Sequence, residues 1–220
     1  MRTIRVTGKG KIKVKPDTTR LTITLEGLEK EYAETLERSS RDTGKLKAAL
    51  EKFGFDRSDV KTLSFSVDAE YRSYKKNETY YSKLVGYRFS HRLKVEFESD
   101  NVRLGKIVYA LARSEVRPEF KISYTVKDPE AVKNELLGKA VADSRAKAVV
   151  LTEAAGVALK DIQNIDYSWG EINFEISPMR DLVCEKMMLS DCSADTGYDY
   201  DIEPDDIEVT DTVTVVWEIE

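Results

Sequence analysis

Period-two alternation marks both ends of the chain and predicts a β-strand at each of them. Between residues 3 and 15, apolar residues and glycines fall on even numbers, and most odd positions carry Lys or Arg. Side chains of a strand point alternately to opposite faces, so this segment is predicted to have one buried face and one lysine-lined face. Gly8 and Gly10 stand on the apolar face, where a glycine pair predicts a bulge or a bend. Residues 207–219 alternate in the same way.

Three segments show the spacing of amphipathic helices. Residues 32–53 carry a stripe spaced 4, 3, 4, 3, 4, 3 that stops before Gly54. Ser39 and Thr43 interrupt this stripe with small polar side chains, which fit either a ligand contact or close packing on a sheet. The other two helices are predicted at 102–114 and 128–155, the second with a proline in its first turn and a glycine just after its end. Further alternating segments predict strands at 21–29, 63–71, 85–97, 120–126 and 162–169.

Two of these elements are predicted to bury particular residues. For the long helix, the apolar residues that fall on one face are Leu137, Val141, Ala148, Leu151 and Ala155. For the strand at 63–71, the side chains that share one face are Leu63, Phe65, Val67, Ala69 and Tyr71. Each set is expected to pack against the rest of the fold.

The order of elements predicts an α+β fold. From residue 18 to 127 the chain reads strand–helix–strand–strand–helix–strand, the split βαβ order of ferredoxin-like proteins. The first strand, the long helix and the last two strands are predicted to form a second layer in which the chain ends pair. We therefore expect a single domain over 1–220 with two subdomains, 18–127 and 1–17 with 128–220, interrupted by an irregular acidic insert at 170–206.

The net charge of −5 is divided unevenly along the chain. Residues 1–110 hold 24 Lys+Arg and 16 Asp+Glu, which gives +8, whereas residues 111–220 hold 11 and 24, which gives −13. Residues 191–211 hold nine acids and no Lys or Arg. Such a division fits attraction between the two halves, attraction between subunits, a cation-binding segment or a merely solvated surface. The net acidity argues against nucleic acid as a main partner, because phosphates require a concentrated cationic face.

Two groups of side chains are candidates for binding. The lysines of the first strand form a possible strip for an anion or a partner, or they protect a sheet edge against unwanted pairing, which we favour. They are Lys9, Lys11, Lys13 and Lys15. Tyrosines are frequent in interfaces because they bury a large area and keep a polar hydroxyl. A run of them gathers on the predicted hairpin: Tyr71, Tyr74, Tyr80, Tyr81 and Tyr87.

Residues that would carry catalysis or bind a metal or cofactor are scarce. His91, the single histidine, lies on the apolar face of its strand and is predicted to be a satisfied core or interface residue. Cys184 and Cys192 are not spaced as zinc ligands and form either a disulfide or two free thiols. The acidic run lacks the register of an EF-hand loop. Since no phosphate-binding or metalloprotease motif is present, we expect no enzyme, no cofactor and no metal site.

Four segments in order resemble motifs of the SIMPL-domain family. They are VTGKG with VKPDT in 6–18, GYRFS with LKV in 86–95, the alanine-rich stretch at 140–159, and IEP at 202–204 leading into a valine-rich strand. The chain departs from the family pattern at Asp205, where the family usually has glycine. The resemblance implies export to the periplasm or cell surface, homo-oligomers in some members and oxidative-stress defence in others. It implies no catalytic residues.

The sequence therefore predicts a non-enzymatic, self-assembling protein related to the cell envelope or to stress. The alternative class is a binding module for a small anionic ligand or a peptide, held along the lysine strand or in a sheet groove. No run approaches the ~18 apolar residues of a membrane span. The first 20 residues do not resemble a signal peptide, which predicts a cytoplasmic protein as written, or a periplasmic or surface protein if a leader was removed.

Overall fold

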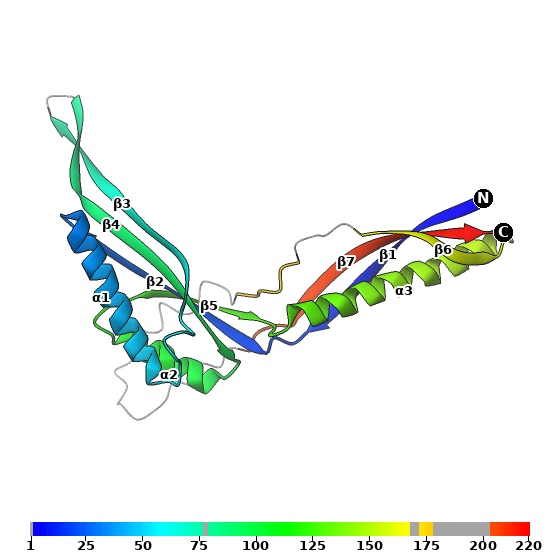
Figure 1. Cartoon of the computed structure of the whole chain (residues 1–220), viewed down its shortest axis with the longest axis horizontal. Helices are drawn as coiled ribbons and strands as arrows, with labels where there is room; N and C mark the ends of the chain where they lie inside the picture. Colours follow the sequence, from blue (N-terminus) through cyan, green and yellow to red (C-terminus); the bar gives the residue numbers. More distant parts are fainter. Residues whose placement is uncertain (1, 77–78, 168–171, 178–202) are drawn as a thin grey trace. The chain divides into compact units, whose positions relative to one another are not determined.

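The computed structural model describes residues 2–76, 79–167, 172–177 and 203–220. The chain divides into two compact units, each with its own antiparallel sheet (Figure 1). The terminal unit comprises Met1–Asp17, Thr125–Ile176 and Pro204–Glu220, and the central unit comprises Thr18–Tyr124 and Ser177–Glu203. The predicted α+β class is confirmed. None of the helices in the described ranges is both long enough and apolar enough to cross a membrane.

The central unit is a four-stranded sheet with two helices. Its strands stand in the order β3-β4-β2-β5, and β4 pairs antiparallel with both β2 and β3. Along the chain its elements are β2 (Thr18–Glu29), α1 (Tyr32–Glu51), β3 (Lys61–Lys76), β4 (Thr79–Glu98), α2 (Asn101–Ala112) and β5 (Glu119–Thr125).

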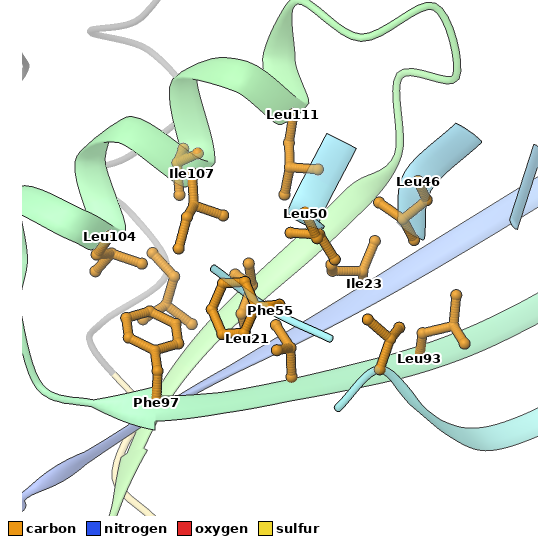
Figure 2. Close-up of a cluster of buried hydrophobic side chains, with 14 of the residues drawn as sticks. Leu21, Ile23, Leu46, Leu50, Phe55, Leu93, Phe97, Leu104, Ile107 and Leu111 are labelled. Atoms are coloured by element: carbon orange, nitrogen blue, oxygen red, sulfur yellow. The ribbon is translucent and has the colours of Figure 1, made fainter. Parts of the chain in front are cut away.

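The core of the central unit lies between the helices and the middle of the sheet. Alternate residues of β2, such as Leu21 and Ile23, are fully buried beside Leu93 of β4. Figure 2 shows Leu46 and Leu50 of α1, together with leucines of α2, approaching the same cluster. Burial of these side chains is the main stabilising contribution, at roughly 1.5–3 kcal/mol for each large one.

Strand β3 departs from its predicted burial. Leu63 and Phe65 are each 46 % exposed, although both share the apolar face of the strand. The reason is topological: β3 is the sheet edge, and α1 packs on β2 and β4. Alternation of apolar residues therefore indicated a strand correctly but did not tell whether a second layer covers it.

The terminal unit joins the two ends of the chain. Its sheet has the order β1-β7-β6, and β1 pairs antiparallel with β7 without interruption from Arg2↔Ile219 to Val14↔Ile207. The long helix α3 packs on β1 and β7. The elements of this unit are β1 (Arg2–Val14), α3 (Pro129–Ala155), β6 (Leu159–Asp166) and β7 (Ile207–Ile219).

Gly8 and Gly10 serve a different purpose from the predicted bulge. Their register with β7 is regular, Gly8 opposite Val213 and Gly10 opposite Asp211. A Cβ atom on Gly8 would overlap the carbonyl oxygen of Ala140, and one on Gly10 would overlap that of Leu136. The glycines thus let the helix backbone approach the strand directly, which no other residue would permit.

Helix α3 begins and ends as predicted but buries a different face. Asp128 caps its start by accepting a hydrogen bond from the Ala131 amide at 2.9 Å, and Gly156 ends it in the left-handed conformation at φ 69°. Of the predicted stripe only Ala148 is fully buried, and Leu151 is exposed. The fully buried residues recur at every fourth position, and all but the first are small or polar: Leu136, Ala140, Ser144, Ala148 and Thr152.

Candidate functional site

A groove of about 540 Å³ lies in the central unit beside helix α1. We call it the α1 groove. Three elements and one loop line it, and every lining residue belongs to the central unit. The lining residues are Leu36, Ser39, Ser40, Thr43, Gly44 and Lys47 of α1, Arg57 of the following loop, Thr62 and Phe65 of β3, and His91 of β4.

The helical repeat explains why α1 supplies most of this wall. Residues three or four positions apart share a helix face, and Ser39, Thr43 and Lys47 follow that spacing. Ser39 is buried and Thr43 is half-buried. The two small polar residues that interrupt the apolar stripe therefore border a cavity. Their short side chains leave its space open.

His91 is held in the groove by two threonines. The hydroxyl of Thr43 lies 3.0 Å from Nδ1 of the imidazole, and the hydroxyl of Thr62 lies 3.0 Å from Nε2. The ring of Phe65 meets the imidazole edge-on, with centroids 5.2 Å apart and planes at 81°. His91 is thus a satisfied residue at the edge of the core, with both ring nitrogens occupied by hydroxyl groups.

The charges around His91 favour its neutral form. Partial burial lowers the pKa of His91 below its ordinary 6.5, and the ammonium of Lys47 lowers it further. Arg57 supplies a second cation, whose guanidinium lies 3.4 Å from a carboxylate oxygen of Glu51. Lys47 has no ion-pair partner among the residues that the structure describes. The lining residues that the structure describes include two cations and no carboxylate, which makes this lining electropositive.

The β3–β4 hairpin forms a second candidate surface. Strand β2 pairs with β4 only as far as Tyr87, so the segments 71–76 and 79–85 pair with each other alone. We call these segments the tyrosine hairpin. In Figure 1 they continue beyond the end of β2. Tyr74 stacks on Tyr81 at a centroid distance of 5.7 Å, and the ammonium of Lys75 lies 6.0 Å from the ring of Tyr80.

Four of the five predicted interface tyrosines occupy this hairpin. Tyr71 and Tyr80 are 61 % and 74 % exposed, and Tyr74 and Tyr81 are about half exposed. Tyr87 lies apart from them: it is half-buried, and its ring packs edge-on against Tyr32 at the start of α1, 5.5 Å away. The structure therefore places Tyr87 at the base of the hairpin, packed within the unit.

The predicted lysine strip lies along β1, an edge of the terminal sheet. All four side chains are exposed. Glu208 of the neighbouring strand binds two of them, Lys11 at 2.5 Å and Lys13 at 3.7 Å, and so neutralises part of the strip. The lysines hold the pKa of the Glu208 carboxyl below its usual range, by hydrogen bonding first and charge second.

The β1 edge is also covered by side chains of α3. Asp143 accepts a hydrogen bond from the Lys9 amide at 2.7 Å, and Lys147 donates to the Thr7 carbonyl at 3.3 Å. Asp143 and Lys147 are themselves 2.7 Å apart. Such cover over outward-facing backbone groups keeps an edge strand from pairing with another chain.

Several predicted features fall where the structure gives no description. Cys184, Cys192 and the acidic residues from 191 to 202 lie outside the described residues. Of the acidic run, Glu203, Asp205 and Asp206 are described and exposed, and Asp211 accepts a hydrogen bond from the Tyr167 hydroxyl at 3.0 Å. Within the described ranges, no three His, Cys, Asp or Glu side chains gather as a metal site would require.

Half of the ten lining residues of the α1 groove were not singled out from the sequence, among them Lys47, Arg57 and Thr62. Lys47 and Arg57 appear there as ordinary surface cations, and Thr62 as a strand residue. A partial signal existed for Lys47, because it continues the Ser39–Thr43 spacing by one more turn. Arg57 and Thr62 reach the groove only through the pairing of β3 with β4, which sequence spacing does not reveal.

The chain is similar in sequence to known bacterial proteins. It is 28% identical over 163 residues to the 26 kDa periplasmic immunogenic proteins of Brucella melitensis biotype 1 and Brucella abortus strain S19. The aligned part is 74% of this chain and 65% of each relative, so the chain spans about two thirds of their length. The sequence model of SIMPL, described as a protein of unknown function (DUF541), matches residues 4–217. The match runs through both units, and the chain belongs to the SIMPL family.

Proposed function

We propose that this protein is a non-enzymatic, self-associating component of the cell envelope. In the proposed contact, the tyrosine hairpin of one copy binds an acidic surface of another. The observation that carries this proposal is the hairpin itself, a two-stranded ribbon with four exposed tyrosines. The envelope location rests on the periplasmic names of the relatives. A role in oxidative-stress defence rests on the family resemblance.

The hairpin has the composition of an interface. Tyrosine and arginine are enriched where proteins meet, because each buries a large area and keeps polar contacts. A two-stranded ribbon alone is only marginally stable in water. Packing of its aromatic rings against a second copy would give the exposed tyrosines an apolar neighbour and order the ribbon at the same time.

Charge points to the same partner. The described cations of the hairpin, Arg72, Lys75 and Lys83, are exposed. In the terminal unit and at its border, the carboxylates of Glu203, Asp205 and Asp206 are exposed and have no ion pair within the described part of the chain. Opposite charges on two surfaces of one protein favour head-to-tail contacts between copies, and such contacts close into rings or extend into filaments.

Light scattering at low salt and at ~1 M salt tests self-association, since the screening length falls to ~3 Å at 1 M. We expect a mass that is a multiple of 25.0 kDa at low salt and a smaller mass at high salt. The double variant Arg72→Glu/Lys83→Glu should remain monomeric at both. The matched control Arg113→Glu changes an exposed cation on another element and should assemble like the wild type. A monomeric wild type, or a variant that assembles normally, would refute the proposal.

The non-enzymatic part of the proposal has its own support. In the α1 groove both nitrogens of His91 are occupied by threonine hydroxyls, and the described lining residues include no carboxylate or thiol. A general base needs a nitrogen free to take a proton from the reacting group. A screen of ester, amide, phosphate and glycoside substrates should therefore give no turnover. Turnover that His91→Ala abolishes would overturn this part.

A further inference from the structure

We propose that the α1 groove binds a small organic oxyanion, a carboxylate or phosphate group attached to a flat apolar body. This inference goes beyond self-association and uses different residues from the tyrosine hairpin. It rests on three features of the groove: its charge, its hydroxyl groups and its apolar wall.

The charge of the groove selects an anion. Lys47 is half-buried on the groove wall and has no ion-pair partner in the part of the chain that the structure describes. Arg57 on the same wall has only a 3.4 Å contact with Glu51, and both of these side chains are largely exposed. Ion pairs of this kind contribute little. An oxyanion in the groove would gain a free ammonium and a guanidinium that can turn toward it.

The hydroxyl groups give the anion hydrogen-bond donors. In a neutral imidazole one nitrogen donates and the other accepts. One of the two threonines must therefore donate to His91, while the other accepts from it and keeps its own hydroxyl proton for a further partner. Ser40 is exposed on the same wall and adds a second hydroxyl. The groove thus offers neutral donors beside its cations in either tautomer.

The apolar wall selects what the anion is attached to. Leu36 and Phe65 are exposed large apolar side chains that line the groove, one on α1 and one on β3. The Phe65 ring is fixed by its edge-on contact with His91. Aromatic rings gain additional attraction when they pack on one another. A ligand with a ring beside its oxyanion would cover both side chains.

His91 reports binding directly because it is the only histidine in the chain. In the free groove, burial and Lys47 lower its pKa. An anion nearby favours the imidazolium form, so binding should raise that pKa. The experiment is an NMR pH titration of the imidazole protons with inorganic phosphate, phenyl phosphate, benzoate or the neutral benzyl alcohol as probe.

We expect phenyl phosphate or benzoate to raise the pKa of His91 in a saturable way, and inorganic phosphate to act more weakly. Benzyl alcohol should leave it unchanged. Which of the two aromatic anions binds better identifies the oxyanion. Lys47→Ala should weaken binding about tenfold, the loss expected for one charge-assisted hydrogen bond. Each variant is compared with its own probe-free titration, because removing Lys47 alone raises the starting pKa.

Lys45→Ala is the matched control, since Lys45 lies on the same helix, is paired with Glu115 and does not line the groove. It should bind the probes like the wild type. Phe65→Ala should remove the advantage of phenyl phosphate over inorganic phosphate. If no probe moves the His91 titration at tens of millimolar, or if Lys47→Ala and Lys45→Ala respond alike, the groove is not an anion site. Self-association, measured separately by light scattering, is unaffected by either result.

Discussion

The backbone of Gly8 in β1 lies directly against the backbone of Ala140 in α3. A Cβ on Gly8 would overlap the Ala140 carbonyl oxygen and come within 2.5 Å of the Ser144 amide nitrogen. Main-chain atoms of a helix cannot rotate away as a flexible side chain does. The terminal unit therefore depends on a glycine where the sequence pattern alone calls for an apolar residue.

Gly8→Ala should accordingly lower the free energy of unfolding of the terminal unit by about 3 kcal/mol, the upper end for overpacking. Urea denaturation followed by circular dichroism measures the change. Gly138→Ala is the control, because Gly138 lies within α3 with nothing near its missing Cβ. That substitution should raise stability by about 0.5–1 kcal/mol through helix propensity. A tolerated Gly8→Ala would mean that α3 does not approach β1 this closely.

Arg103 in α2 is expected to stabilise the central unit as a planar cation. Its guanidinium lies 4.4 Å from the ring centre of Phe55 and 5.3 Å from that of Phe97, and it donates to the Phe53 carbonyl at 2.9 Å. Arg103→Lys keeps the charge but loses the planar stacking and the fork of donors. We expect Arg103→Lys to lower the free energy of unfolding, measured by chemical denaturation, by about 1–2 kcal/mol.

The control for this variant is Arg113→Lys. Arg113 also lies over an aromatic ring, that of Tyr109 at 5.0 Å, and donates to the hydroxyl of that residue, but it is exposed. Arg113→Lys should therefore lower the free energy of unfolding by less than about 0.5 kcal/mol. Equal effects of the two variants would contradict a special role for Arg103.

Asp143 should protect the Lys9 amide from exchange with solvent. Because β1 is an edge strand, this amide has the Asp143 carboxylate as its partner at 2.7 Å. Asp143→Ala removes the acceptor, so hydrogen exchange at Lys9 should accelerate by about tenfold, for a bond of ~1.4 kcal/mol. Asp143→Asn keeps an acceptor oxygen and should retain most of the protection. Unchanged exchange in Asp143→Ala would show that another group covers this edge.

His91 should make stability depend on pH in one direction. Its folded-state pKa is lowered from 6.5 by burial and by Lys47, so the unfolded chain takes up the proton first. The contribution of neutral His91 to the free energy of unfolding is fully present above about pH 6.5. It is lost as the pH falls through the lower pKa of the folded state. Denaturation midpoints of the wild type should decline between pH 7 and pH 5. The midpoint of His91→Gln should decline less over the same range, since carboxylates titrate mainly below it. If the midpoints of both proteins fall with the same slope, His91 is not the source of the pH dependence.

The positions of strands and helices were largely readable from the sequence, because period and punctuation are local signals. The alternation over residues 3–15 corresponds to β1, and Asp128, Pro129 and Gly156 bound α3 as their backbone preferences require. Each of these residues acts on its immediate neighbours. Local physics was sufficient for them.

Burial was harder to predict, because it depends on what packs across from each residue. The large residue Leu151 was expected inside α3 and is exposed, whereas Ser144 is fully buried. Where α3 approaches Gly8 most closely its inward residues are the small Ala140 and Ser144, which hydrophobicity does not mark. The candidate site shows the same division: Ser39, Thr43 and His91 were noticed individually, but their convergence required the packing of α1 on β4.

The pairing of β1 with β7 also sets an order of events on the ribosome. The described strands of the central unit have all been synthesised by residue 125, so its sheet can form while the remainder is still being made. The terminal sheet must wait, because its middle strand is β7, the last to be translated. Until Ile207–Ile219 emerges, β1 lacks the strand that it pairs with in the described part of the chain, and its apolar face is exposed. In a nascent chain β1 therefore stays unpaired longer than any strand of the central unit. A chaperone could bind its exposed apolar face during this interval.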